Sequence, residues 1–240
     1  MARVIDFETE FPKISNSYLS QEQRHQFFEK LKQVVVIVNT EIPGTSKATR
    51  PMVLRGAGVI IDKNGTILTS AYLVPDNTQS IRVRREVDEH FWEANREGKM
   101  PKHDLAILVP KKNVCAFDFA TFDEEERFDI GKEVLCISHT GNFIYTLMIG
   151  HLACQDHRLL SDMEDELEKL APSSLDGDLK LLQINNFHGW NNAMGAPVFS
   201  SSGRVIGLST IKEQASLVRP PRHSKACDPD MGDDLSLVCK

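Results

Sequence analysis

Short runs of apolar residues, rich in Val, Ile and Leu, recur along the chain with turn-forming residues between them. Runs of this length and composition are typical of β-strands. The pattern predicts strands at 34–39, 56–62, 66–69, 80–85, 104–109, 133–138, 144–153, 181–185, 197–200 and 205–210. Many short strands with local connections favour a sandwich or barrels over alternating strands and helices, so we expect an all-β protein.

Two dipeptides predict hairpins within this pattern. Asn64-Gly65 separates two of the predicted strands. A type I′ turn needs positive φ at both central residues, and Asn and Gly adopt this conformation at little cost. Ser202-Gly203 has a similar place in the second half of the chain. We therefore expect a hairpin at each dipeptide, with a type I′ turn at the first.

Three segments favour helix instead of strand. Ser20-Gln-Glu-Gln23 fits a capping box and predicts a short helix that continues to about Lys32. Residues 87–99 have helical composition, with aromatic residues able to pack and charged residues able to face water. Residues 161–170 begin with a Ser-x-x-Glu capping box and end before a proline, which predicts a short acidic helix on an exposed loop.

The two ends of the chain lack a clear pattern. Residues 1–19 are expected to form an extended arm. Residues 216–240 contain a Pro-Pro pair, an Asp/Gly cluster and little periodicity, which predicts a flexible tail.

Composition and charge narrow the class of protein. The chain has 240 residues, of which 41% are hydrophobic and 26% charged, enough for one large all-β unit or two modest domains. The net charge of -6 argues against a general nucleic-acid binder, because phosphate contacts need a clustered basic face. The basic stretches 82–85 and 219–222 are short and are interpreted as solvated surface.

The cysteines and the N-terminus bear on the compartment. The five cysteines are odd in number and form no CxxC pair, which favours a reducing, intracellular environment. The first twenty residues lack the basic start, apolar run and cleavage site of a secretory signal. The longest apolar run, 34–38, is far too short to span a bilayer. We expect a protein of the cytoplasm or nucleus with no membrane partner.

Four blocks of the sequence resemble one protein family. The stretch from Gly56-Ala-Gly-Val to Ala71-Tyr72 resembles the segment of trypsin-like proteases of the HtrA (Deg) family that runs from a GSGV strand to the catalytic histidine. His103-Asp104-Leu-Ala-Ile-Leu is similar to their aspartate strand, and residues 130–150 are similar to the start of their second barrel. Residues 182–210 resemble the strand, nucleophile loop and closing hairpin. Four blocks in the family's order are more specific than a single motif.

The resemblance implies a fold and a domain organisation. It implies two six-stranded antiparallel β-barrels of the trypsin (chymotrypsin) type, packed side by side with an active cleft between them. We expect a protease-homology domain at 20–215, with the first barrel at about 33–120 and the second at about 121–215. HtrA proteins usually carry a PDZ domain after the protease, whereas only the predicted tail follows here.

The resemblance places the catalytic triad at Tyr72, Asp104 and Met194. Trypsin-type hydrolysis needs a serine hydroxyl that attacks, an imidazole that accepts its proton and a buried carboxylate that orients the imidazole. A phenol with a pKa near 10 is a poor proton shuttle at neutral pH, and a thioether has no ionisable hydrogen. Asp104 keeps the family's residue type, but because the other partners are absent we interpret it as a polar strand start, bonded to Tyr72 or a backbone amide, instead of a catalytic residue. We expect no intact catalytic site.

The oxyanion hole and the cleft are inferred from the same resemblance. The backbone N–H donors of the hole correspond to Asn192 and Met194. The family has glycine at the first of these positions, so the loop either collapses or keeps its shape because Asn tolerates left-handed geometry. Residues near the cleft rim either line a binding groove or cover the barrel end. These candidate cleft residues are His188, Trp190, Asn191 and Gly195.

Two further patterns predict no additional chemistry. Ser200, Ser201 and Ser202 fall where the resemblance implies a hairpin turn, and Ser is a common turn former. His151, Cys154 and His157 recur every three residues, a spacing that alternates faces along a strand, and no second ligand pair accompanies them. We expect no metal site and no cofactor.

The function that these residues favour is binding without catalysis. We interpret the chain as a catalytically inactive serine-protease homologue that binds protein or peptide through its cleft or loops, because strand addition needs no nucleophile. The alternatives are a divergent serine-type endopeptidase, an inactive subunit assembled with active HtrA-like proteases, or a duplicate under weak constraint. The resemblance also implies a homo- or hetero-oligomer, such as the family's trimer. The acidic segment 162–168 is either a contact for a basic partner or a solvated helix.

Overall fold

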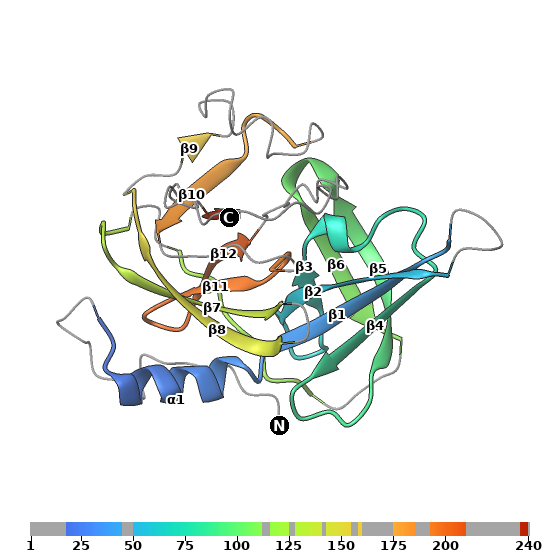
Figure 1. The fold of residues 1–240 in the computed structure, drawn as a ribbon, viewed down its shortest axis with the longest axis horizontal. Coiled ribbons are helices and arrows are strands. Elements are labelled where there is room, and N and C mark those ends of the chain that lie inside the picture. The colour runs from blue at the N-terminus through green and yellow to red at the C-terminus, as the bar shows by residue number, and fades with distance from the viewer. Residues whose placement is uncertain are drawn as a thin grey trace, which may run out of the picture.

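The computed structural model describes residues 18–44, 50–111, 116–124, 128–140, 143–154, 158–159, 175–185, 193–209 and 236–239. In these segments two β units lie side by side, with one α-helix along the outside of the second unit (Figure 1). The predicted all-β class, with two barrel-like units and a short N-terminal helix, is therefore confirmed. No helix among the described segments combines the length and apolar character needed to cross a membrane.

The first unit is a closed barrel in which every neighbouring pair of strands is antiparallel. Its strand order is β1-β2-β3-β6-β5-β4. The bounds are β1 Val35–Ile42, β2 Met52–Ile60, β3 Ile67–Thr69, β4 Ser80–Arg85, β5 Trp92–Met100 and β6 Leu105–Pro110. Two 3₁₀ turns connect these strands, η1 Ala71–Leu73 and η2 Pro101–His103.

The second unit is a sheet that curls on itself. Its order is β13-β12-β11-β7-β8-β10-β9, and β13 pairs with β10 as well as with β12, so six of the strands form a continuous ring. The bounds are β7 Glu133–Thr140, β8 Phe143–Leu152, β9 Arg158–Leu159, β10 Lys180–Asn185, β11 Pro197–Ser200, β12 Val205–Ser209 and β13 Ser236–Cys239. The ring-closing β13 lies within the stretch that the sequence predicts as a tail.

The apolar run at the start of β1 is buried on both faces. Val36 and Val38 point into the core of the first barrel, whereas Val35 and Ile37 belong to the core that is shared with the second sheet and α1. A strand that is covered on both faces has a continuous run of apolar residues instead of an alternation of apolar and polar residues. The run therefore forms part of the packing between the two units.

The helix α1, Gln21–Leu31, begins where the sequence predicts. The Ser20 hydroxyl accepts from the Gln23 N–H at 3.2 Å, and the Gln23 side chain accepts from the Ser20 N–H at 2.8 Å, which is the predicted capping box. Phe27 and Leu31, one turn apart, are buried against the second sheet. Arg24 on the same helix donates to the fully buried carboxylate of Glu133 on β7, at 2.6 Å.

Each predicted strand overlaps an observed strand, but the helix predicted at 87–99 is wrong, because β5 occupies most of it. Trp92 is half-buried and Ala94 is buried against the first barrel's core, while Glu93 and Asn95 are exposed. This alternation has the period of a strand. β5 also pairs with β4 and β6, and its register shifts between Arg96 and Gly98. Pairing on both edges outweighs the weak helical preference of the composition.

The hairpin predicted at Asn64-Gly65 exists, but its turn is not type I′. Gly65 has a φ of 83°, and Asn64 is not among the described residues with positive φ. The Asp62 carboxylate accepts from the Asn64 N–H at 2.8 Å and from the Thr66 N–H at 3.0 Å. These side-chain bonds hold a longer turn in which only the glycine is left-handed. The hairpin predicted at Ser202-Gly203 is confirmed, with Gly203 at a φ of 77°.

Several sequence-based expectations fall outside the described residues. These are the arm at 1–17, the acidic helix at 161–170 and the tail apart from β13. They stay predictions, as do the proposed domain boundaries.

Candidate active site

Tyr72 occupies the 3₁₀ turn η1 directly after the short strand β3. The turn begins at Ser70, whose hydroxyl accepts from the Tyr72 N–H at 3.1 Å. Serine favours such a position because its side chain satisfies a backbone N–H that the turn leaves without an acceptor. The local sequence therefore fixes the backbone of Tyr72.

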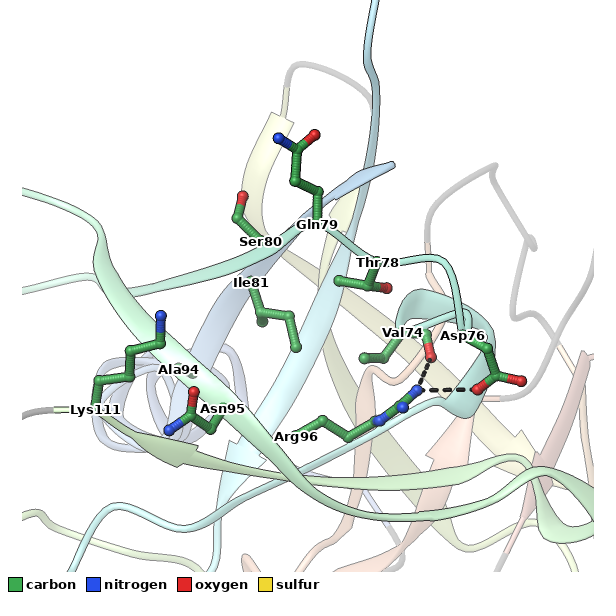
Figure 2. Close-up of a pocket in the computed structure, with 10 residues that line it drawn as sticks. All are labelled: Val74, Asp76, Thr78, Gln79, Ser80, Ile81, Ala94, Asn95, Arg96 and Lys111. Carbon is green, nitrogen blue, oxygen red and sulfur yellow. Dashed lines mark hydrogen bonds and ion pairs between the residues drawn. The ribbon is translucent and has the colours of Figure 1, made fainter. Parts of the chain in front are cut away.

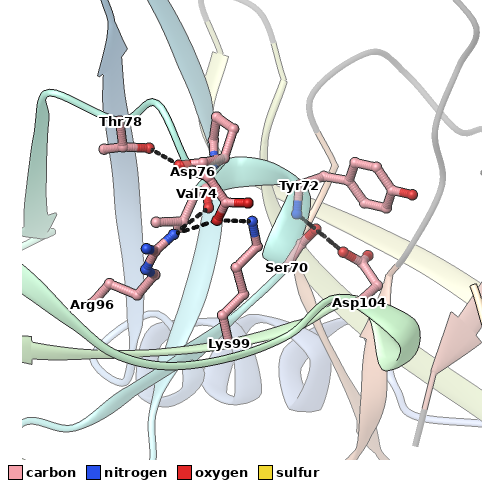
Figure 3. A network of polar contacts seen from close by, with 9 residues as sticks. Ser70, Tyr72, Val74, Asp76, Thr78, Arg96, Lys99 and Asp104 are labelled. Atoms are coloured by element: carbon pink, nitrogen blue, oxygen red, sulfur yellow. Dashed lines mark hydrogen bonds and ion pairs between the residues drawn. The ribbon is translucent and has the colours of Figure 1, made fainter. Parts of the chain in front are cut away.

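Asp104 joins this turn to the next connection of the first barrel. It follows η2 with a left-handed backbone, φ 51° and ψ 39°, which aspartate tolerates better than most residues. Its Oδ1 accepts from the Ser70 hydroxyl at 2.7 Å and from the Tyr72 N–H at 3.2 Å. Its carbonyl accepts from the Ala71 N–H at 3.2 Å. Asp104 thus holds the backbone on which Tyr72 sits, whereas the Tyr72 ring points away from the carboxyl (Figure 3).

The Asp104 carboxyl is deeply buried, with 1% of the residue exposed. Burial raises its pKa to about 7, although the bonds from Ser70 and the backbone N–H groups act in the opposite direction. Its Oδ2 has no hydrogen-bond partner among the described residues. At neutral pH this group is therefore divided between its charged and neutral forms.

Met194 and Gly195 are the central residues of a tight turn. The Ala196 N–H donates to the Ala193 carbonyl at 3.0 Å, and Gly195 has a φ of 71°, which is the geometry of a type II turn. The turn is tied to the second sheet by the Gly195 N–H, which donates to the Ser209 carbonyl at 3.0 Å.

The same turn is also held against the first barrel. The Ala57 N–H on β2 donates to the Met194 carbonyl at 3.0 Å. A Cβ added at Gly195 would collide with the Ala57 carbonyl and crowd the Thr69 hydroxyl and the Ser70 N–H. Only glycine allows this approach, both because of its positive φ and because of the lack of space. Met194 itself is half-buried, and its side chain packs against the core of the first barrel.

The structure therefore brings together the three positions that the resemblance selects. Ser70 links them, because it bonds to both Tyr72 and Asp104 and lies against Gly195. Sequence reasoning missed Ser70. Serine is a common capping residue, and its position directly before Ala71-Tyr72 at the end of a strand could have indicated this role. The residue types at these positions supply a phenol, a carboxyl and a thioether, which is not the set that acyl transfer requires.

The other candidates have different places. His188, Trp190, Asn191 and Asn192 lie outside the described residues, so Gly195 is the one candidate cleft residue that the structure describes. Ser200 and Ser202 are at the β11–β12 turn, where their hydroxyls bond to each other at 2.7 Å.

The histidines and cysteine considered for a metal have separate contacts. The His151 ring packs edge-on against Tyr18, and Cys154 donates to the Gln183 side chain at 3.3 Å, while His157 lies outside the described residues. Within the described segments, no three His, Cys, Asp or Glu side chains are arranged to hold a metal ion.

Comparison with known proteins gives one family and two similar structures. Residues 56–208 match the model of a family described as the trypsin-like peptidase domain. The active form of the Rv3671c protease from M. tuberculosis is similar with a TM-score of 0.65 and 17% identity, over 93% of this chain and 83% of that one. The inactive form of the Rv3671c protease gives a TM-score of 0.63 and 15% identity, over 93% and 91%. These likenesses concern the fold. No curated protein in the comparison matches the sequence.

Proposed function

Because the chain belongs to the trypsin-like peptidase domain family, we propose that it is a catalytically inactive serine-protease homologue that binds protein or peptide through its cleft or loops. The observation that supports the proposal is that well-bonded turns carry side chains unsuited to acyl transfer. Tyr72 and Met194, to which the sequence resemblance assigns the base and nucleophile positions, lie on turns bonded to Asp104 and to Ala57. The sequence blocks that resemble HtrA proteins favour this branch of the family.

The chemistry of the two altered positions argues against hydrolysis. Serine proteases transfer an acyl group to a hydroxyl oxygen while an imidazole takes the proton. The Met194 thioether has no proton to give and cannot form the acyl-enzyme. Tyr72 bonds to Asp104 through its backbone N–H, so the carboxyl does not orient a base as it does in the triad. With nucleophile and base both replaced, at most the residual acceleration of ~10³ to 10⁴-fold over water that an intact oxyanion hole supplies is expected.

Binding, in contrast, depends on parts of the site that persist. A trypsin-like cleft holds its substrate partly as an added β-strand along a sheet edge, through backbone hydrogen bonds that do not involve the triad. The turn at Met194-Gly195 is bonded to both β units, which ties the two units together beside the expected cleft. A cleft that is ordered before binding loses less entropy than one that must first order itself.

The first test is labelling of the purified full chain with a fluorophosphonate, followed by intact mass spectrometry. We expect no adduct on folded protein, because the sequence resemblance places Met194 where the reactive serine of the family stands. A single stoichiometric adduct would overturn the proposal, and mapping the labelled residue would identify the nucleophile.

A back-substituted chain tests whether the geometry is that of a protease. Tyr72→His together with Met194→Ser restores the missing base and nucleophile beside Asp104. We expect labelling by the same probe and slow peptide hydrolysis, with either single variant as the control. If the double variant shows neither labelling nor hydrolysis, the loop at 192–194 does not form an oxyanion hole. The backbone of the site would then differ from the protease geometry that the proposal requires.

One observation favours a divergent serine endopeptidase as a second candidate. The Ser70 hydroxyl donates to the Asp104 carboxylate at 2.7 Å, and the pKa of this carboxyl is raised by burial to about 7, which suits a general base. Ser70 is 1% exposed, however, so a substrate carbonyl reaches it only if the Tyr72 turn opens. Labelling that disappears in Ser70→Ala would support this candidate and contradict the inactive homologue.

A further inference from the structure

A pocket of about 250 Å³ lies in the first barrel, between β4 and β5 (Figure 2). Only two residue pairs join these strands, Arg82 with Glu93 and Val83 with Trp92. Beyond the pairs the strands separate, and the pocket opens where Ser80 and Ile81 no longer face a bonded partner on β5.

The pocket combines an apolar floor with a polar wall. Val74, Ile81 and Ala94 are buried residues of the first barrel's core and provide the floor. Hydroxyls, amides and charged groups provide the wall. They belong to Asp76, Thr78, Gln79, Ser80, Asn95, Arg96 and Lys111. Polar residues outnumber apolar ones in this lining, so the pocket suits a polar or charged ligand better than an apolar one.

Arg96 is the central polar group of this wall. Its Nη1 donates to the Asp76 carboxylate at 3.0 Å and to the Val74 carbonyl at 3.4 Å. Its Nε and Nη2 make no hydrogen bond within the described part of the chain. These two atoms form the fork that binds the two oxygens of a carboxylate side by side.

The two other charged groups of the wall are exposed. Asp76 shares one oxygen between Arg96 and Lys99, at 3.0 Å each, while 84% of its side chain is exposed. Lys111 donates to Glu93 at 2.7 Å, and their side chains are 47% and 62% exposed. Exposed pairs of this kind contribute little stability, so a ligand can exchange with them at small cost.

We propose that this pocket binds a short aliphatic carboxylate. The carboxylate bonds to the free fork of Arg96, with Lys111 contributing the second positive charge. The aliphatic stem covers Val74, Ile81 and Ala94, whose side chains form the floor. This site is separate from the candidate active site, and its test does not depend on hydrolysis or on peptide binding in the cleft.

The experiment uses the purified full chain and two probes, glutarate and the capped peptide acetyl-Gly-Glu-Gly-amide. Two-dimensional amide NMR follows each titration to about 10 mM, a range that captures the weak affinity expected of a few contacts. We expect saturable shifts confined to 74–81, 94–96 and 111. A response to glutarate alone identifies a free organic acid as the ligand, whereas a peptide response of equal or greater strength identifies an acidic side chain.

Variants test whether the Nε and Nη2 atoms of Arg96 bind the carboxylate. Arg96→Gln and Lys111→Gln are each expected to lower the affinity for the probe by about tenfold, which is the loss expected for a charge-assisted hydrogen bond. Arg96→Lys keeps the charge without the fork and is also expected to bind more weakly than the wild type. Lys63→Gln, at an exposed turn outside the pocket, is the matched control and is expected to bind normally. The proposal is overturned if no local shifts occur, or if every variant binds as tightly as the wild type.

Discussion

Replacing Asp104 by Asn is expected to change how the stability of the protein depends on pH. The carboxyl is buried, and its Oδ1 accepts from Ser70 and from the Tyr72 N–H. An asparagine of the same shape keeps that acceptor, so the two bonds survive and the main loss is the titrating group. The variant therefore isolates the proton equilibrium of one side chain.

The magnitude follows from the pKa of Asp104 in the two states. The ordinary value of 3.8 describes the unfolded chain, and burial raises the pKa in the fold to about 7. Between these values the unfolded chain loses the proton while the fold keeps it, so stability falls as the pH rises. The stabilising contribution of the buried, protonated Asp104 is complete below pH 3.8 and is lost above about pH 7. Since each pH unit corresponds to about 1.36 kcal/mol, the whole interval corresponds to about 4 kcal/mol.

The assay is denaturant unfolding of the wild type and Asp104→Asn at several values between about pH 4 and about pH 8. Groups other than Asp104 titrate in both proteins and cancel in the difference. Asp178→Asn, which removes an exposed carboxyl, controls for the loss of one acidic group. We expect the stability of the wild type relative to Asp104→Asn to fall by about 4 kcal/mol across this interval. A constant difference, or one that rises with pH, would show that the carboxyl is charged throughout and refute the reasoning.

Two further predictions concern the contact between the two β units at Gly195 and the contact between α1 and the second sheet at Arg24. Gly195→Ala should lower the free energy of unfolding by about 3 kcal/mol and Gly131→Ala by about 1 kcal/mol, because both have positive φ but only Gly195 lies against the Ala57 carbonyl. Equal losses in urea unfolding would contradict the close contact. Arg24→Ala should cost about 2 kcal/mol, less than a fully buried pair because 35% of the Arg24 side chain is exposed. Adding Glu133→Gln should recover part of this loss in the same assay, and the absence of recovery would contradict an unpaired buried charge.

The sequence by itself determined the elements whose signals are local. The capping box at Ser20 predicted the start of α1, because it depends on atoms only three residues apart. The apolar runs predicted most of the strands, and the residue types at 72 and 194 excluded a serine–histidine pair at those positions. These features need no knowledge of what lies across the sheet.

Tertiary structure decided the features that depend on distant partners. β5 is a strand because it pairs with β4 and β6, although its composition favours a helix. β13 closes the second sheet from the end of the chain, through pairing with β10 and β12. The raised pKa of Asp104 and the role of Ser70 arise from burial and from a bond across 34 residues. Pairing and burial are properties of neighbours in space, and a linear sequence specifies those neighbours only after the chain has folded.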